Sequence, residues 1–239
     1  MSFYAYKDEL RTQIIYATET TAEDKGKYFF CENPECNARL HLDALNSEGP
    51  LPYFAARKKN FKHVKNCFFE SKKNLFVEDK YDENLFNFDE LVNEYLNGSV
   101  RRIPNRLYTL SQIYRMCKSK NIDSLYNNIS IWKILCDCRS NHIYTKGIYG
   151  AHLIECKALK YDPNESTVSF KYPINDSLPN KYDLKVIIDN KDLFNTIKNL
   201  ILTDERKITK RPIIIIGNWQ KNENYYVTSM ATKTQLYVP

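Results

Sequence analysis

Residues 29–42 read FFCENPECNARLHL, and this stretch decides how the N-terminal part of the chain folds. Cys31 and Cys36 lie on either side of Asn33-Pro34, a dipeptide typical of turns. A turn at this point folds the chain back, so that both thiolates can reach one metal ion. The stretch therefore resembles a zinc knuckle, which supplies two of the four ligands that zinc needs.

A second pair of candidate ligands lies within residues 61–69, FKHVKNCFF. The spacing of His63 and Cys67 is i, i+4, which in a helical turn places both on one face. Zinc favours four tetrahedral thiolate or imidazole ligands. The predicted metal ligands are Cys31, Cys36, His63 and Cys67. The alternative is that three cysteines are simply buried and the histidine is on the surface, as in many reduced intracellular proteins.

Three thiolates and one imidazole fill every position around zinc and leave none for water or substrate. We therefore expect Zn²⁺ in a structural role. Residues 1–75 contain too few apolar side chains to fold unaided, so the metal would supply much of the free energy of folding of this zinc-binding module. The elements expected in it are a strand within 12–20, a helical turn closing on Gly26, a hairpin of 27–31 with 38–42, and a strand at 52–57.

Length and composition describe an ordinary folded chain. It has 239 residues, 43% of them hydrophobic, which is enough for a packed core. No run approaches the roughly 18 consecutive apolar residues that span a bilayer, and the first residues, MSFYAYKDELRT, lack the pattern of a signal peptide. Seven cysteines without regular spacing are typical of a reducing compartment and of metal use. These features predict a cytoplasmic protein.

Charge is arranged in blocks although the net charge is only +6. Residues 57–73 are basic, residues 76–97 are acidic, and residues 98–120 are basic again. Lysine and arginine displace condensed counterions from nucleic acid, so a basic block beside a zinc module is typical of a phosphate-binding surface. A solvated face that aids solubility is the alternative. The candidate nucleic-acid-binding residues here are Arg57, Lys58, Lys59, Lys62, Lys65, Arg101 and Arg102.

Residues 76–107 are expected to form an acidic helix and a basic linker. The apolar stripe in residues 87–97 predicts the helix, which ends near Gly98, and Pro104 interrupts the basic segment after it. Thr109 and Gln112 then form a capping-box pattern at the start of a second helix over 108–119, and a third, short helix is expected near 131–138.

From about residue 142 the periodicity predicts strands and one amphipathic helix in a definite order. The strands are expected at 152–162, 166–174, 182–189, 211–219 and 225–238, with a helix capped by Asp189 after the third. The order β-β-β-α-β-β matches an OB-fold, a five-stranded barrel that commonly binds oligonucleotides. The predicted fold is therefore α+β, with a zinc-stapled N-terminal module and an OB-like domain over 108–239.

The outward positions of these strands are rich in lysine. In the second strand Val168, Phe170 and Tyr172 alternate with Thr167, Ser169 and Lys171. Aromatic rings interleaved with lysines are used by proteins that bind single-stranded nucleic acid, although for any one of Trp219, Tyr225, Tyr226 and Tyr237 we favour a place over the barrel core. The further candidate nucleic-acid-binding residues are Lys157, Lys171, Lys185 and Lys233.

An enzymatic alternative rests on Asp137, Glu155 and Lys157, the residue types of a PD-(D/E)xK nuclease. There, two carboxylates hold a divalent metal and the lysine orients the attacking water. On a strand Glu155 and Lys157 point to the same side. The three-residue pattern is unspecific, and two further strands before the helix fit a nuclease core less well. Cys136, Cys138, His142 and Cys156 are a weaker alternative for a second metal site, since their apolar neighbours favour buried thiols.

Residues 12 to about 70 resemble the zinc-binding N-terminal module of competence protein CoiA-like bacterial proteins. The resemblance is carried by YATET at 16–20, GKYFFCENPECNARLHL at 26–42, PYFAAR at 52–57 and HVKNC at 63–67. It implies that Cys31, Cys36, His63 and Cys67 bind the metal. In that family the module precedes a nuclease-like region, and membership implies a role in handling DNA during uptake and recombination.

Taken together, the sequence predicts a zinc-containing nucleic-acid-binding protein of bacterial DNA handling, with DNA, single-stranded or as a processing intermediate, as its expected partner. A metal-dependent nuclease is the first alternative. A protein-interaction adaptor, in which the zinc module and the barrel bind polypeptide, is the second. No membrane partner is expected.

Overall fold

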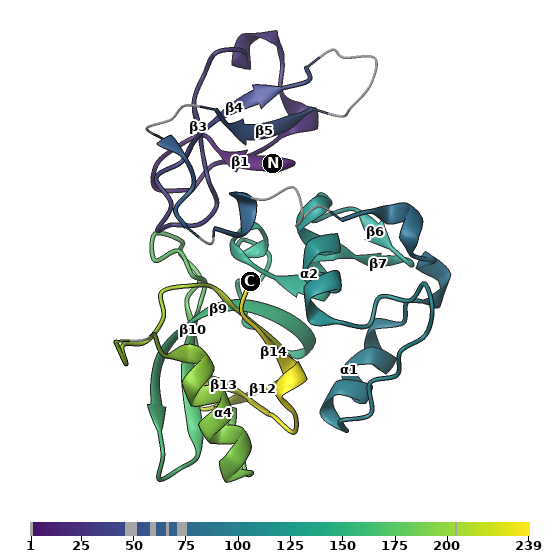
Figure 1. The fold of residues 1–239 in the computed structure, drawn as a ribbon, viewed down its shortest axis with the longest axis vertical. Helices are drawn as coiled ribbons and strands as arrows, with labels where there is room; N and C mark the ends of the chain where they lie inside the picture. Colours follow the sequence, from purple (N-terminus) through teal and green to yellow (C-terminus); the bar gives the residue numbers. More distant parts are fainter. Residues whose placement is uncertain (1, 46–51, 58–60, 66, 71–75, 204) are drawn as a thin grey trace. The chain divides into compact units, whose positions relative to one another are not determined.

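The computed structural model describes residues 2–45, 52–57, 61–65, 67–70, 76–203 and 205–239. The chain divides into two compact units (Figure 1). The first unit comprises residues 1–76 together with 118–121, and the second comprises 77–117 and 122–239. Together they form a mixed α+β protein. Predictions for residues 46–51, 58–60, 66, 71–75 and 204, which include Lys58 and Lys59, lie outside the described residues.

The first unit is built on a five-stranded sheet in the order β2-β1-β3-β4-β5. Its core is aromatic and aliphatic, with Tyr4, Phe29, Leu40 and Phe54 almost completely buried. The expected hairpin is confirmed, since Phe29 pairs with Leu40 in antiparallel register. The strands are β1 (Tyr4–Tyr6), β2 (Ile14–Tyr16), β3 (Phe29–Phe30), β4 (Arg39–Asp43) and β5 (Tyr53–Ala56).

Short 3-10 turns connect and follow these strands. One of them, η2 (Ala22–Asp24), is the helical turn expected before Gly26, and Gly26 has a φ of 88°. The expected strand within 12–20 is shorter than predicted, because η1 (Ala17–Glu19) takes over directly after β2. A further turn, η4 (Phe68–Glu70), buries Phe68 and Phe69.

The second unit begins with two amphipathic helices. Helix α1 (Phe88–Leu96) is capped by the Asn87 side chain, which accepts a hydrogen bond from the Glu90 amide at 3.2 Å. Helix α2 (Leu110–Ser119) carries the predicted capping box: the Gln112 backbone N–H donates to the Thr109 hydroxyl at 3.3 Å, and the Thr109 backbone N–H donates to the Gln112 side-chain oxygen at 3.0 Å. The turns before α1 are η6 (Glu78–Lys80) and η7 (Glu83–Leu85).

Residues 77–107 do not behave as a free linker, because they belong to the second unit. The apolar face of α1 packs against the strands β12 (Ile213–Asn222) and β9 (Gly150–Asp162). This packing buries Leu91 and Val92 of α1. It also buries Ile214 and Ile216 of β12, whose side chains face away from the barrel interior. The smaller elements after α2 are β6 (Leu125–Tyr126), β7 (Ile129–Ser130), α3 (Ile131–Ile134), β8 (Leu135–Cys136) and η8 (Cys138–Ser140).

Five strands of the second unit close into a barrel, coloured green to yellow in Figure 1. Antiparallel pairing joins β9 to β10 (Thr167–Tyr172) and β10 to β11 (Tyr182–Ile187). Strand β11 then pairs in parallel with β13 (Tyr225–Ser229), which pairs with β12. The ring closes where β12 pairs with β9, from Ile213 opposite Cys156 to Trp219 opposite Gly150. The predicted order β-β-β-α-β-β is confirmed, and the barrel is consistent with an OB-like one.

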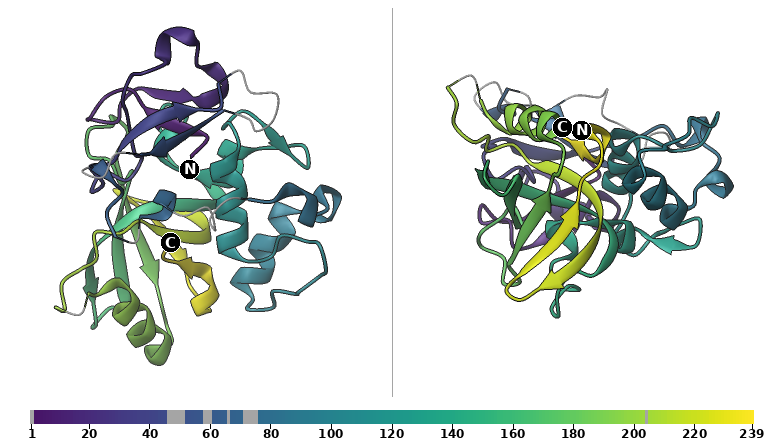
Figure 2. Two further views of the ribbon diagram at one scale, coloured as in Figure 1. Left: turned by 45° about the horizontal axis from the view of Figure 1, so that its top comes forward. Right: turned by 90° about the horizontal axis from the view of Figure 1, so that it is seen from below.

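Helix α4 (Lys191–Ile201) connects β11 to β12 and lies beside the barrel strands in the views of Figures 1 and 2. It buries Phe194, Ile197 and Ile201 in the barrel core, with Val168, Phe170, Leu184 and Val186 from the strands. Its cap is Asn190 and not Asp189, since the Asn190 side chain accepts from Leu193 N–H at 2.9 Å. Aspartate and asparagine both cap helices well, so the sequence alone could not decide between Asp189 and its neighbour Asn190.

The predicted last strand is two strands. After β13 the chain leaves the sheet, makes the turn η9 (Lys233–Gln235), and returns as β14 (Leu236–Tyr237), which pairs with β12. Strand β8 adds a parallel partner to β9. Among the described residues, no helix is both long and apolar enough to cross a bilayer.

Candidate metal centre and nucleic-acid interface

The four predicted metal ligands come together in the first unit. One ligand atom from each of Cys31, Cys36, His63 and Cys67 lies within 4.8 Å of all the others. The Cys31 and Cys67 sulfur atoms are 3.6 Å apart, and the Cys36 sulfur is 3.4 Å from His63 Nδ1. All three cysteines are buried and unbonded to one another. The cluster therefore has the donor set and spacing of a metal site.

The distances suit a tetrahedral ion better than a disulfide. With metal–sulfur bonds of about 2.3 Å, the sulfur–sulfur edge of a tetrahedron is about 3.8 Å, close to the Cys31–Cys67 separation. A disulfide would need its sulfur atoms about 2.05 Å apart. Four converging ligands occupy the whole tetrahedron, so the site can hold a metal in a structural role.

The first ligand pair is presented by the predicted turn. Cys36 N–H donates to the Asn33 carbonyl at 2.9 Å, and Glu35 N–H donates to the Asn33 side-chain oxygen at 3.0 Å. Asn33 thus closes the turn twice, once with its backbone and once with its side chain.

Arg11 holds the same turn from outside. Its Nε donates to the Cys31 carbonyl at 2.7 Å, and its terminal nitrogen donates to the Cys36 carbonyl at 2.8 Å. One guanidinium therefore fixes the spacing of both ligand residues. This role could not be predicted from the sequence, because Arg11 is 20 and 25 residues away from its two partners.

The second ligand pair is not presented by a helix, contrary to the sequence-based expectation. Residues 62–64 have no regular secondary structure, and a turn closed by Cys67 N–H and the Val64 carbonyl at 3.0 Å brings the ligands together. A helix of so few residues is costly to nucleate, and a turn satisfies the same ligand geometry. The side-chain nitrogen of Asn33 also approaches the Cys67 sulfur, at 4.0 Å.

The thiols differ in their readiness to ionise. Burial raises the pKa of Cys31 well above its ordinary value of 9.0, whereas hydrogen bonds from the Cys31 and Cys67 thiols lower the pKa of Cys36. For Cys67, the contact with Cys31 lowers the pKa, but hydrogen bonding to Cys36 and burial outweigh it and raise the value to about 12. Without a metal the cluster thus loses a proton most readily from Cys36, while Cys31 and Cys67 retain theirs more strongly. A divalent cation would displace those protons on binding.

The barrel gathers three of the predicted lysines on its outer surface. Lys171 on β10 lies directly opposite Lys157 on β9. Lys185 on β11 lies opposite Ser169, two residues before Lys171 on the same strand. The inward neighbours Phe170, Leu184 and Val186 are buried, so the predicted alternation is confirmed. Lys157, Lys171 and Lys185 form what we call the barrel lysine face.

Each lysine of this face is paired with a carboxylate that the sequence analysis did not single out. Lys157 and Lys171 both bind Asp176, Lys171 at 3.2 Å, and Lys185 binds Glu165 at 2.6 Å. The hydrogen bond from Lys157, followed by that from Lys171, lowers the pKa of Asp176. The Lys185 ammonium also lies 5.6 Å from the centre of the Tyr225 ring. Sequence reasoning missed the acids because they lie in the turns between the strands, 5 to 20 residues away from their lysine partners.

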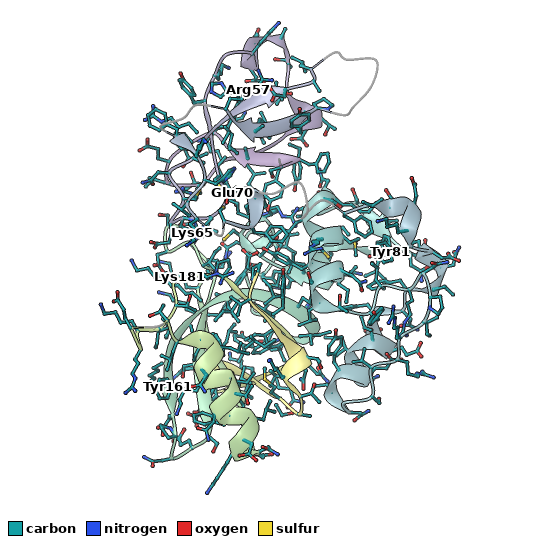
Figure 3. The ribbon with its side chains drawn as sticks, viewed as in Figure 1. Arg57, Lys65, Glu70, Tyr81, Tyr161 and Lys181 are labelled. Atoms are coloured by element: carbon teal, nitrogen blue, oxygen red, sulfur yellow. The ribbon has the colours of Figure 1, made fainter. Side chains whose placement is uncertain are left out.

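The remaining candidate nucleic-acid-binding residues do not share this surface pattern. Arg57 binds Asp43 at 2.5 Å, and Lys62 and Lys65 are exposed in the first unit (Arg57 and Lys65 are labelled in Figure 3). Arg101 bridges Glu90 and Glu94 in the second unit. Arg102 and Lys233 are exposed there.

Of the alternative catalytic residues, two come together. Carboxylate oxygens of Asp137 and Glu155 lie within 4.8 Å of each other, and both residues are buried. Asp137 accepts hydrogen bonds from the backbone and side chain of Arg139, and Glu155 accepts one from the Tyr114 hydroxyl at 2.6 Å. Lys157 is committed to Asp176 instead.

The cysteines of the second unit are core residues. Cys136 and Cys156 lie in the barrel core, where burial raises the pKa of each thiol. They do not gather with Cys138 and His142 into a metal-binding group in the part of the chain that the structure describes. Trp219 and Tyr226 also lie in this core, as expected of them.

No protein-family model matches this chain, and no curated protein matches it either. The function must therefore be inferred from the chemistry of the metal-ligand cluster and of the barrel lysine face.

Proposed function

We propose that this chain is a zinc-containing nucleic-acid-binding protein that takes part in bacterial DNA handling. DNA, single-stranded or as a processing intermediate, is the proposed ligand, and the cytoplasm the proposed location. Zn²⁺ has a structural role in this proposal, and the second unit is proposed to act as an OB-fold. The resemblance of residues 12–70 to the CoiA-like module supports the assignment to DNA.

The observation that carries the proposal is the barrel lysine face. Lys157, Lys171 and Lys185 lie on three neighbouring strands, and Lys185 lies beside the ring of Tyr225. Ammonium groups spaced along a sheet can follow a phosphate backbone, and an adjacent aromatic ring offers a surface on which a base can stack. The same strands keep Val168, Phe170 and Val186 in the core, so the face is held on a rigid scaffold.

Zinc is the metal that best fits the cluster of Cys31, Cys36, His63 and Cys67. Thiolates exclude the hard cations Mg²⁺ and Ca²⁺, which prefer oxygen ligands, and a closed tetrahedral Cys₃His set is a common structural zinc site. Bound there, zinc would join the turn after β3 to the segment before η4. The experimental readout is the metal content of the purified protein, measured by mass spectrometry, with one zinc per chain expected.

The binding proposal is tested by removing the charge of the lysine face. The variant Lys157→Gln, Lys171→Gln, Lys185→Gln should bind labelled oligonucleotides more weakly, and the dependence of its affinity on salt should be shallower. The matched control replaces three exposed lysines of the same unit, Lys191, Lys207 and Lys210, by glutamine. An equal loss of affinity in both variants would show that the barrel lysine face is not the binding surface. Salt-insensitive binding by the parent protein would contradict the proposal itself.

A nuclease is the second candidate, because the carboxylates of Asp137 and Glu155 lie together in one unit. Such a pair can hold a divalent cation that activates water. Against it, Arg139 neutralises Asp137, and Lys157 is paired with Asp176 on the barrel surface. The test is cleavage of labelled DNA in the presence of Mg²⁺ or Mn²⁺, with Glu155→Gln as the inactive variant. Intact strands under both metals would exclude this candidate.

A further inference from the structure

We propose that Lys157 and Lys171 form a phosphodiester-binding site, which the chain's own Asp176 carboxylate occupies in the absence of nucleic acid. This inference rests on the proposed function and deepens it. It assigns one phosphate of the ligand to a specific pair of side chains, and it gives the protein an internal competitor for that phosphate.

The register of β9 and β10 brings the two lysines together. Lys157 and Lys171 are direct cross-strand neighbours, and like charges at such positions repel each other. An anion between them removes the repulsion. In the structure this anion is the Asp176 carboxylate, which both ammonium groups bind. The two lysines therefore already converge on one point where a negatively charged oxygen is held.

The Asp176 carboxylate can be displaced from the two lysines at a low cost in free energy. The Asp176 side chain is 58% exposed, and the two lysine side chains are 26% and 29% exposed. Ion pairs on the surface contribute little to stability, so these contacts do little to hold the fold. A phosphodiester carries the same single negative charge as the carboxylate, and exchanging one for the other leaves the charge of the site unchanged.

The loop that carries Asp176 is anchored by hydrogen bonds to another part of the second unit. Residues 173–181 connect β10 to β11, and the far end of this loop is fixed, because the backbone and side chain of Asn180 make hydrogen bonds with Asn141 at 2.6 to 3.3 Å. Closer to Asp176, Ser177 N–H donates to the Asn175 side chain at 3.0 Å. The loop is anchored while the Asp176 side chain projects toward solvent, so rotation of that side chain alone can open the site.

The test compares affinities for a fluorescein-labelled oligothymidylate over a series of salt concentrations, using the full-length, zinc-loaded protein. Asp176→Asn keeps the shape of the side chain and removes its charge, so we expect binding to tighten about three- to tenfold at low salt. Glu205→Gln is the matched control, since Glu205 also pairs with an exposed lysine of this unit, Lys207. It should change the affinity less than twofold, about the effect of one exposed charge.

A third variant identifies the lysines. Adding Lys157→Gln and Lys171→Gln to Asp176→Asn should abolish the gain and reduce the slope of log affinity against log salt by about 0.7, the contribution of one single-strand phosphate. Thermal unfolding of every variant checks that the fold is kept.

The outcomes separate this inference from the function on which it rests. Salt-sensitive binding by the parent protein with no gain in Asp176→Asn would overturn the inference and leave the proposed function in place. Binding by Asp176→Asn alone would support both, because the parent site would then be closed by its own carboxylate. An absence of binding by both proteins to single-stranded and duplex DNA and to RNA would overturn both.

Discussion

Arg11 shows how much of the candidate metal site depends on a residue that binds no metal. Its guanidinium donates to the carbonyls of Cys31 and Cys36, and so sets the distance between two ligand residues. Groups that orient ligands in this way commonly change metal affinity by one to two orders of magnitude when they are removed.

We therefore expect Arg11→Gln to weaken zinc binding about 10- to 100-fold while the ligands themselves remain. Competition with a chromogenic chelator measures the affinity. Arg39→Gln serves as the control, since Arg39 lies on β4 of the same unit and stacks on Phe61. An unchanged affinity in Arg11→Gln would show that the turn closed by Asn33 is sufficient.

His152 gives the second unit a dependence on pH. Each ring nitrogen faces a backbone carbonyl at 2.8 Å, Nδ1 that of Lys133 and Nε2 that of Tyr149. Burial lowers the pKa of His152 from its usual 6.5 and outweighs the two hydrogen bonds, which raise it. The unfolded chain therefore takes up the proton first as the pH falls.

The stability contributed by neutral His152 should be complete above about pH 6.5 and should decline as the pH drops below it. Urea unfolding, followed by tryptophan fluorescence at a series of pH values, measures this. His152→Gln cannot take up the proton, so its stability should vary less over the same range. Parallel curves for the two proteins would exclude His152 as the cause.

At the scale of elements, helix α1 is tied to the chain that follows it by a buried ion pair. Glu94 on α1 binds Arg106 at 2.7 Å, and both side chains are almost fully buried, at 6% and 4% exposure. Arg101 adds an exposed contact to the same carboxylate. This network explains why the basic segment 99–106 is not a free linker.

Removing one partner of a buried pair leaves the other charge without compensation, so Glu94→Gln should lower the free energy of unfolding by about 3 kcal/mol. Denaturant unfolding of the purified variant measures the change. Glu90→Gln is the matched control, because Glu90 is 48% exposed and its partner Arg101 is exposed as well. Its effect should stay below about 1 kcal/mol.

Elements with strong local signals were predictable, and contacts between distant residues were not. Alternation in 166–174 and the apolar stripe in 87–97 correctly predicted β10 and α1, because both patterns are local consequences of burial. The prediction that a helix presents His63 and Cys67 was wrong, because a spacing of four residues between two ligands fits a turn as well as a helix. Arg11, Asp176 and Glu165 escaped notice because only the folded chain brings them to their partners.

At the scale of the whole molecule, the two units have separate cores, and the cluster of three cysteines and one histidine lies in the first. Structural zinc contributes about 10–16 kcal/mol in small zinc-binding peptides, more than the stability of a typical domain. The small first unit should therefore unfold when the metal is removed, while the barrel should remain folded.

Both tryptophans, Trp132 and Trp219, belong to the second unit, so their fluorescence reports on that unit alone. Treating the zinc-loaded protein with a chelator should change the far-ultraviolet circular dichroism and leave the tryptophan emission almost unchanged. Restoring zinc should reverse the change. A loss of both signals together would mean that the units unfold cooperatively.

The barrel closes through the strands that come last in the chain. Strands β9, β10 and β11 can pair as soon as they have been synthesised, but the pairings that complete the ring, β9 with β12 and β11 with β13, require residues 213–229. A growing chain on the ribosome therefore presents two open strand edges until these residues emerge. Lys157, Lys171 and Lys185, on the outer surface of those strands, would help keep the nascent sheet from pairing with other chains before the ring is complete.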